Sequence, residues 1–257
     1  MQRRHAIKDS DWERIESLFP PENTGEGRPS KSNRLMLDGM LWKVKTGAPW
    51  RDLPERFGPW ETIYGRFRLW SQNEVFSVIF EALTQEADLQ EVSLDSTSCK
   101  VHQHAAGAKK GAENAENNQE IGCSRGGRNT KIHAVVDALG NPVHLFLTPG
   151  NTHDSAVAVN VLSKVPLVQS VVLADKAYGS LAIRSFIESQ QATFCIPPRA
   201  NASEPWACDF HRYKERHVVE CFFNQLKQFR GVATRYEKLS RHFLSFVYLA
   251  STMILLK

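Results

Sequence analysis

A continuous apolar run in the second half of the chain limits its possible folds most strongly. Residues 170–174 read Ser-Val-Val-Leu-Ala, without a charged side chain, and Asp175 follows directly. Strands that are buried on both faces of a sheet have such a uniform composition, whereas half-exposed strands alternate apolar and polar residues. The run therefore predicts a buried strand of an α/β domain.

The segments before and after this run predict the rest of that domain. An alternating segment over residues 91–95 is typical of a strand, and residues 131–136 and 143–147 flank a Leu-Gly-Asn-Pro turn, as in a hairpin. We expect helices over residues 155–165 and 180–189, a short strand over residues 194–196, and a long helix from about residue 211 onward. This order of strand, hairpin, helix, strand, helix, strand and helix indicates a mixed-sheet α/β domain over residues 89–257.

The first 88 residues predict a separate, small all-α domain. Capping residues and apolar spacing indicate helices over about residues 11–19, 32–46, 53–57, 60–71 and 73–85. The third and fourth of these, joined by Gly58-Pro59, resemble a helix-turn-helix. In the fourth helix Ile63, Phe67 and Trp70 lie at spacings i, i+4 and i+7, which predicts one buried stripe.

The outward side of the fourth helix is polar and basic. Thr62, Arg66 and Arg68 lie away from the apolar stripe, and such residues on a recognition helix contact bases and phosphates. The net charge is only +4, but residues 28–70 hold nine Lys and Arg against four Asp and Glu, and residues 209–242 hold eight against four. The split distribution indicates two DNA-contacting regions. An ordinary solvated helix face is the alternative for the fourth helix.

Two aspartates stand where expected strands end. Asp95 ends the strand over residues 91–95, and Asp175 follows the buried run. Carboxylates at the ends of adjacent strands can converge outside the sheet edge, where open α/β sheets usually place their sites. Their oxygens suit Mg²⁺ or Mn²⁺, which are hard cations. The pair indicates a divalent-cation site, although either aspartate alone could simply open a loop or cap a helix.

The helix expected from about residue 211 has a polar side and a separate apolar side. Four residues share the polar side: Tyr213, Arg216, Glu220 and Lys227. At about 100° per residue they fall within about 60° of arc. If the apolar side, which includes Val218, Phe222 and Leu226, packs on the sheet, Glu220 overhangs the strand ends. A solvated face with ion pairs is the alternative.

These motifs resemble those of the DDE transposases of bacterial insertion sequences, most closely the insertion sequence five family. Residues 95–97, Asp-Ser-Thr, are similar to the family's first aspartate motif, and residues 174–179, Ala-Asp-Lys-Ala-Tyr-Gly, are similar to the second. The spacing from Tyr213 through Arg216 and Glu220 to Lys227 matches the third signature. Residues 47–54 resemble the group's DNA-binding module, so the resemblance extends over nearly the whole chain.

The resemblance implies a ribonuclease-H-like catalytic domain that follows the helix-turn-helix-like domain in the sequence. It also implies that Asp95, Asp175 and Glu220 are the catalytic residues and hold two divalent cations, Mg²⁺ or Mn²⁺. The substrates would be the element's terminal inverted repeats and target DNA, which the protein would cut and join. Arg216 and Lys227 would hold phosphates near the scissile bond, while Tyr213 would contact the DNA backbone or pack beside the site. Pairing two DNA ends implies a homo-oligomer.

Two other functions are the alternatives, and the first of them would have the same carboxylates. A ribonuclease-H-like nuclease would cut DNA without strand transfer, and a catalytically silent descendant would repress transposition by binding DNA. We expect neither a membrane span nor a small-molecule cofactor, and a cytoplasmic location with nucleoid association on DNA. The five cysteines, irregularly spaced, indicate reduced thiols. Cys99, His102, His104 and Cys123 lack the paired spacing of a zinc site.

Other carboxylates near the motifs have ordinary structural explanations. Asp137 precedes the hairpin turn, where aspartate is common, and Asp154 stands where a helix N-cap is expected. We expect His133 and His153 to be structural as well.

Overall fold

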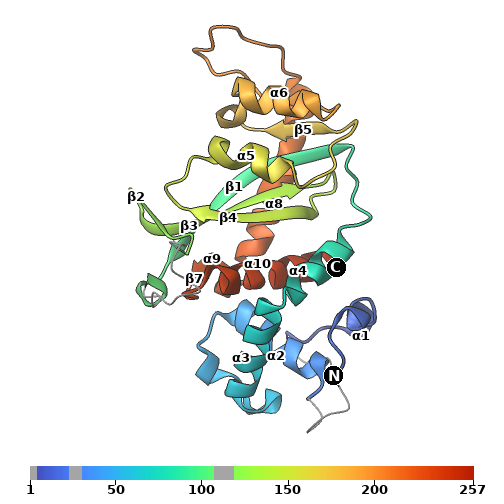
Figure 1. Cartoon of the computed structure of the whole chain (residues 1–257), viewed down its shortest axis with the longest axis vertical. Helices are drawn as coiled ribbons and strands as arrows, with labels where there is room; N and C mark the ends of the chain where they lie inside the picture. The colour runs from blue at the N-terminus through green and yellow to red at the C-terminus, as the bar shows by residue number, and fades with distance from the viewer. Residues whose placement is uncertain (1–4, 23–30, 107–118) are drawn as a thin grey trace. The chain divides into compact units, whose positions relative to one another are not determined.

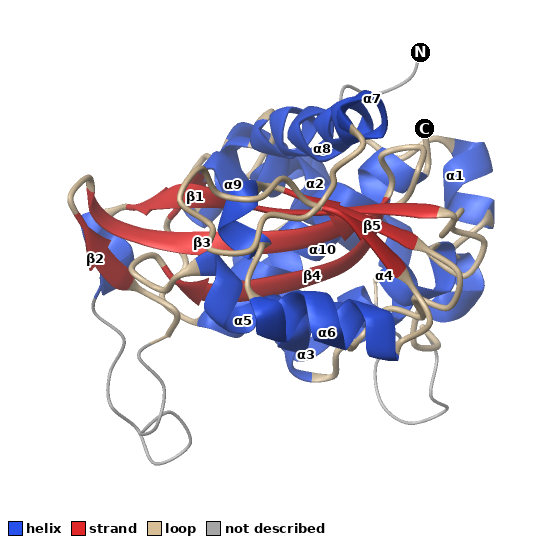
Figure 2. Cartoon of the chain, turned by 90° about the horizontal axis from the view of Figure 1, so that it is seen from above, coloured by secondary structure: helices blue, strands red, loops and turns tan. Residues whose placement is uncertain are grey.

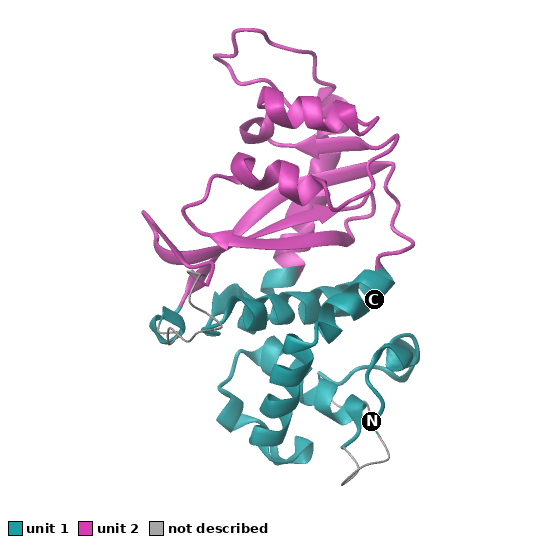
Figure 3. Cartoon of the chain, viewed as in Figure 1, with its two compact units in different colours: residues 1–83, 102–107, 226–257 teal, residues 84–101, 108–225 magenta. Residues whose placement is uncertain are grey.

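The structure, a computed structural model, describes residues 5–22, 31–106 and 119–257. The chain divides into two units, shown in different colours in Figure 3: residues 1–83, 102–107 and 226–257 form a helical unit, and residues 84–101 and 108–225 form an α/β unit. Residues 1–4, 23–30 and 107–118 lie outside the described residues.

The α/β unit is built on a mixed sheet (Figure 1). Its strands are β1 (Glu91–Val101), β2 (Gly122–Ser124), β3 (Gly127–Val136), β4 (Pro142–Pro149), β5 (Val171–Ala174) and β6 (Thr193–Cys195). They follow the order β2-β3-β1-β5-β6, and β4 pairs with β3 beside β2. The β1–β5 and β5–β6 pairs are parallel, whereas β1–β3 and β3–β4 are antiparallel. All four residues of β5 are buried, which confirms the buried strand expected from the apolar run.

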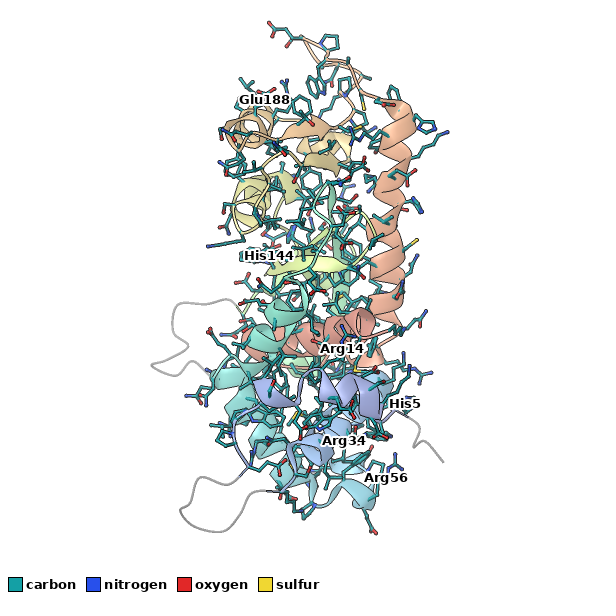
Figure 4. All side chains as sticks on the ribbon, turned by 90° about the vertical axis from the view of Figure 1, so that its right-hand side faces the viewer. His5, Arg14, Arg34, Arg56, His144 and Glu188 are labelled. Carbon is teal, nitrogen blue, oxygen red and sulfur yellow. The ribbon has the colours of Figure 1, made fainter. Side chains whose placement is uncertain are left out.

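Helices cover both faces of this sheet (Figure 2). On one face lie α5 (Asp154–Leu162) and α6 (Leu181–Ser189); on the other lie α7 (Phe210–Tyr213) and α8 (His217–Lys227). Figure 4 shows these layers from another side, with side chains filling the spaces between them. Val161 of α5 and Ile183 of α6 pack in one core with Val92, Leu94 and Val172 of the central strands. This three-layer arrangement is the expected mixed-sheet α/β fold.

Strand β1 is longer than the sequence indicates. We expected Asp95 to end it, but β1 continues to Val101. The cause is the pairing of β1 with its antiparallel neighbour β3. This pairing runs from Ser93 to Lys100, whereas β1 pairs with β5 only from Glu91 to Leu94. Antiparallel hydrogen bonds to β3 therefore extend the strand after the parallel partner has ended.

The helical unit contains α1 (Asp9–Glu13), α2 (Asn33–Thr46), α3 (Trp60–Gln72), α4 (Val75–Leu83), α9 (Arg230–Ala233) and α10 (Ser240–Leu255), with the short strand β7 (Thr234–Arg235). Helix α10 packs against α2, α3 and α4. Gly47 ends α2 in the left-handed conformation at φ 70°, as expected from its position. None of the described helices is both long and apolar enough to span a membrane.

Two helices expected in the helical unit differ from the structure. The helix expected over residues 11–19 is divided into α1 and the 3-10 turn Glu16–Leu18. Residues 53–57 do not form one helix; two 3-10 turns, Trp50–Asp52 and Glu55–Phe57, replace it. Pro54 separates these turns, because proline has no N–H to donate within a helix. In addition, residues 226–257, which the sequence assigns to the catalytic domain, group with the N-terminal helices. The division at residue 88 stays a prediction about function.

Candidate active site

The strand register brings Asp95 and Asp175 together. The parallel β1–β5 pair ends with Leu94 opposite Ala174, and one aspartate follows each of these residues. Adjacent strands are about 4.8 Å apart, so both carboxylates start from neighbouring points at the carboxyl end of the parallel pair. Figure 1 shows β1 and β5 side by side. The convergence expected from the sequence is therefore present, although Asp95 lies within its strand and not at its end.

Backbone N–H groups orient both carboxylates. Asp95 Oδ1 accepts a hydrogen bond from the Ser96 amide at 2.7 Å, and Asp175 Oδ1 accepts one from the Ala177 amide at 2.7 Å. The second bond makes Asp175 the N-cap of the 3-10 turn Lys176–Tyr178. Burial raises the pKa of Asp95, and the charge of Asp175 raises it further, against the opposing effects of the Ser96 amide and Arg216. Like charges that share a half-buried position favour a bound cation.

Arg216 connects Asp95 to Glu220. Its Nη1 donates to Asp95 Oδ2 at 2.8 Å, and its Nη2 donates to Glu220 Oε1. Arg216 and Glu220 form an i,i+4 pair, and the Arg216 side chain is only 16% exposed. This bridge links Glu220, through Arg216, to Asp95 at the sheet edge. The overhang of Glu220 above both strand ends stays a prediction.

The helix that presents these residues is less regular than expected. Tyr213 ends the short α7, Arg216 ends the 3-10 turn Lys214–Arg216, and α8 begins only at His217. Its apolar side is buried as expected at Phe222 and Leu226, while Val218 is half-buried.

The other two residues of the signature have different positions. Tyr213 packs against Val171 and Leu173 of β5, and its ring centre lies 5.8 Å from the Arg216 guanidinium carbon. This packing agrees with one of the two alternatives for Tyr213, and contact of Tyr213 with the DNA backbone stays a prediction. Lys227 is the last residue of α8, about two turns after Glu220, and is half-exposed.

Sequence reasoning missed a polar network behind Asp95. Asp154 Oδ1 accepts hydrogen bonds from Ser96 Oγ at 2.8 Å and from Lys131 Nζ at 2.9 Å. The expectation that Asp154 caps its helix is wrong, because His153 occupies the N-cap position and the Asp154 side chain is bonded to Ser96 and Lys131. No local spacing links residues 96, 131 and 154, so only the fold reveals this network.

Asp137 and His133 have the structural roles expected of them, while the structural role expected of the exposed His153 stays a prediction. Asp137 Oδ1 accepts hydrogen bonds from the amides of Leu139 and Asn141, and these bonds stabilise the hairpin turn. His133 Nε2 lies 2.8 Å from Thr148 Oγ1 within the sheet, and burial lowers the His133 pKa to about 4. His133 is therefore uncharged at neutral pH and structural.

The expected recognition helix α3 has the predicted two sides. Ile63, Phe67 and Trp70 are almost completely buried, at 0–1% exposure. Thr62 and Arg68 are exposed, but Arg66 is only half-exposed, and its Nη1 lies 3.4 Å from Asn33 Oδ1.

Among the described residues, no three His, Cys, Asp or Glu side chains converge as a ready metal site. The donor chemistry of Asp95, Asp175 and Glu220 still fits a hard divalent cation, since all three offer carboxylate oxygens. Arg216 supplies the positive charge between two of them in this structure.

Comparison with known proteins extends these observations. One family model, described as a putative transposase of the IS4/5 family, matches residues 7–80, and another, the transposase DDE domain, matches residues 86–255. The chain is 44% identical over 129 residues to a putative transposase for insertion sequence element IS6501 of Brucella ovis, covering 50% of this chain and 98% of that protein. It is 40% identical over 105 residues to the uncharacterized protein y4sN of Sinorhizobium fredii, covering 41% of this chain and 84% of that one.

Among solved structures, the fold is similar to that of the piggyBac transposase in its synaptic complex with hairpin DNA. The TM-score is 0.53 at 10% sequence identity, covering 98% of this chain and 71% of the other. At this identity the similarity shows the fold alone, and it agrees with the ribonuclease-H-like sheet expected from the sequence. The DDE-domain match over two thirds of the chain decides the family, and the N-terminal match decides its type. The chain therefore belongs to the transposase DDE domain family, as a transposase of the IS4/5 type.

Proposed function

We propose that this transposase binds the terminal inverted repeats of its insertion sequence and both cuts and joins DNA at one site formed by Asp95, Asp175 and Glu220. The observation that supports the proposal most strongly is the combination of two contacts. The β1–β5 register puts two aspartates at one sheet edge, and Arg216 joins the third acid to the first. Three acids from distant parts of the sequence thereby belong to one polar cluster.

The three carboxylates are the proposed ligands of two divalent cations, Mg²⁺ or Mn²⁺. Such cations, when bound, activate a water or a DNA 3′-hydroxyl and stabilise the leaving oxygen of the phosphodiester. Burial raises the pKa of Asp95 most, and the charge of Asp175 raises it further, as expected for two carboxylates at one sheet edge. A backbone amide bonds Oδ1 of each aspartate, so Oδ2 is the oxygen proposed for a cation, once Arg216 has released that of Asp95.

Arg216 and Lys227 are the proposed phosphate contacts. The Arg216 guanidinium has two donors committed to Asp95 and Glu220, so it must release them before these acids can hold a cation. The planar guanidinium can then bind a DNA phosphate with the same two donors. Lys227 offers a compact charge at the end of α8, the helix that directly follows Arg216.

The helical unit is proposed to bind the element ends. Thr62 and Arg68 are exposed on α3 opposite its buried stripe, as in a recognition helix. The piggyBac transposase, whose fold is similar, forms a synaptic complex with hairpin DNA. For the present chain we likewise propose a homo-oligomer that pairs two DNA ends and then engages target DNA.

The direct test compares isosteric variants in a cleavage and joining assay. Asp95→Asn, Asp175→Asn and Glu220→Gln should each lower Mg²⁺-dependent cleavage at the element ends by at least about 1000-fold, because each removes an ionised ligand. Binding of the ends, measured in parallel without divalent cations, should change less than about threefold. Glu188→Gln, on the distant helix α6, is the matched control and should cut normally.

The same assay separates the alternatives. Cleavage without joining of a supplied 3′-hydroxyl end would identify a nuclease, and binding without cleavage would identify a silent repressor. Full cleavage by any one of the three acid variants would reject that residue as a ligand.

A further inference from the structure

Two cysteines of the α/β unit have their sulfur atoms close together. Cys195 is the last residue of β6 and is 4% exposed, while Cys208 is half-exposed in the segment before α7. Their Sγ atoms are 3.8 Å apart, although the residues are 13 positions apart in the sequence. A disulfide needs an S–S distance of about 2.05 Å, so the sulfurs must move only about 1.8 Å closer.

The fold holds this thiol pair from both sides. Cys195 is fixed by the parallel pairing of β6 with β5, in which it lies opposite Leu173. Its Sγ donates to the Asp209 carbonyl at 3.2 Å, and the Asp209 side chain caps α7 by accepting from two amides of that helix. Cys208 directly precedes this cap, so the contacts that fix Asp209 keep the Cys208 thiol beside Cys195. The proposed cleavage and joining of DNA uses neither thiol.

The two thiols differ in exposure, which gives them different roles in an oxidation. Burial, followed by the hydrogen bond with Cys208, raises the pKa of Cys195 to about 12, so Cys195 keeps its proton at neutral pH. Cys208 is half-exposed and is the thiol that a dissolved oxidant reaches. Accessible thiols that ionise are oxidised first, and a second thiol nearby then resolves the product.

The oxidation needs a two-electron oxidant, and a hydroperoxide such as hydrogen peroxide supplies it. The Cys208 thiolate attacks the O–O bond, which breaks to give a Cys208 sulfenic acid and hydroxide. The Cys195 sulfur then attacks the sulfenic sulfur, the S–S bond forms, and the Cys195 proton leaves with the displaced hydroxide as water. Two thiols thereby lose two protons and two electrons, while one hydrogen peroxide is reduced to two waters.

The thiol pair lies beside a residue of the candidate active site. Cys208 and Tyr213 pack against the same apolar cluster, which contains Cys195 and two residues of β5. Tyr213 ends α7, and its ring lies next to the Arg216 guanidinium, which bonds two of the three acids. A bond that draws Cys208 toward Cys195 therefore acts on the start of α7 and on the packing of Tyr213.

We propose that Cys195 and Cys208 form a reversible disulfide when a hydroperoxide oxidises the protein, and that this bond shifts α7 and lowers the activity of the adjacent site. The second part rests on the proposed function, whereas the first part depends only on the two thiols. A displacement of about 1 Å can lower a rate by about 100-fold, so a small movement of α7 is sufficient.

Peptide mapping of the oxidised full chain tests the disulfide. Hydrogen peroxide, added with a chelator and without divalent cations, should give tryptic peptides linked through Cys195 and Cys208, because Arg199 lies between the two cysteines. Dithiothreitol should separate these peptides. Absence of the linked peptides, or linkage of Cys208 to a different cysteine, would overturn the proposal.

Two variants sharpen this mapping. In Cys195→Ala, Cys208 should accumulate as a sulfenic acid that dimedone traps, because the resolving thiol is absent. Cys123→Ser is the matched control, since Cys123 is an exposed thiol of the same unit outside the pair, and this variant should give the same linked peptides as the unmodified protein. Failure of dimedone to label Cys208 in Cys195→Ala would reject Cys208 as the thiol that the oxidant attacks.

Cleavage of the element ends tests the regulatory part, after catalase has removed the peroxide. The oxidised protein should cut at least about 10-fold more slowly than the reduced protein and should recover with dithiothreitol. Cys208→Ser should cut at the same rate before and after peroxide. If the disulfide forms without a change in rate, the regulatory role is wrong. If the reduced protein does not cut at all, the proposed function and the regulatory role fail together, while the mapped disulfide stands.

Discussion

At the scale of single residues, the main feature is a balance of charge at the sheet edge. Burial and Asp175 make ionisation of Asp95 unfavourable, and Arg216 and the Ser96 amide compensate only in part. Sites that bind cations often contain such unfavourable charge in the metal-free state, because binding groups are arranged for the ligand and not for folding. The acids should therefore reduce the stability of the metal-free protein.

Asp95→Asn measures this effect. A raised pKa in the folded state means that the unfolded chain releases the proton at lower pH, so ionisation of Asp95 favours unfolding. At pH 7 without divalent cations, the variant should melt at a higher temperature than the unmodified protein. The difference should vanish as the pH falls below about 3.9, where both states hold the proton.

Differential scanning calorimetry across this pH range, with Glu188→Gln as control, provides the measurement. Adding Mn²⁺ should reverse the order at pH 7, because only the unmodified protein binds the cation tightly. A melting temperature that falls on substitution without metal would show that Asp95 is a net stabilising ion pair with Arg216.

At the scale of elements, much of the architecture follows from local patterns. The uniform apolar run predicts β5, the alternation and turn residues predict the β3–β4 hairpin, and the i, i+4, i+7 spacing predicts the buried side of α3. These patterns work because each element buries a defined face. The full length of β1 could not be predicted, because pairing with β3 after Asp95 is a contact between distant segments.

The candidate site shows the same division between local and non-local information. Asp95, Asp175 and Glu220 are recognisable because each belongs to a local motif. The Ser96–Asp154–Lys131 network depends on tertiary packing. The partial burial of Arg66 is also a tertiary effect, since its partner Asn33 belongs to another helix.

The outward face of α3 supports a prediction for DNA binding. Arg68→Ala should weaken binding to the element ends and lower the slope of log affinity against log salt by about one, because one phosphate contact is lost. Arg66→Ala should change the slope less, because Asn33 and the Trp70 ring already contact its guanidinium. Fluorescence anisotropy over a range of salt concentrations measures both.

Arg14→Ala serves as the control for net charge, because Arg14 is an exposed arginine of the same unit outside α3 (Figure 4). An unchanged affinity and slope for both α3 variants would reject α3 as the recognition helix. A loss equal to that of Arg14→Ala would indicate a general charge effect.

At the scale of the whole molecule, the chain passes between its two units more than once. The α/β unit contains the three acids, while residues 226–257, which begin at the end of α8, belong to the helical unit. The family models divide the chain between residues 80 and 86, by sequence, whereas the units reflect packing. The boundaries of the family domains therefore need not coincide with the boundaries of the packed units.

We propose that Asp95, Asp175 and Glu220 surround the same cations. Iron-directed backbone cleavage tests it directly: Fe²⁺ replaces Mg²⁺, and ascorbate with peroxide produces hydroxyl radicals that cut the chain near the bound ion. We predict cuts mapped by mass spectrometry in three separate segments, around residues 95, 175 and 220, all suppressed by excess Mg²⁺ and lost in Asp175→Asn. Cuts that omit any one of these segments, or that Mg²⁺ does not suppress, would contradict a shared metal site.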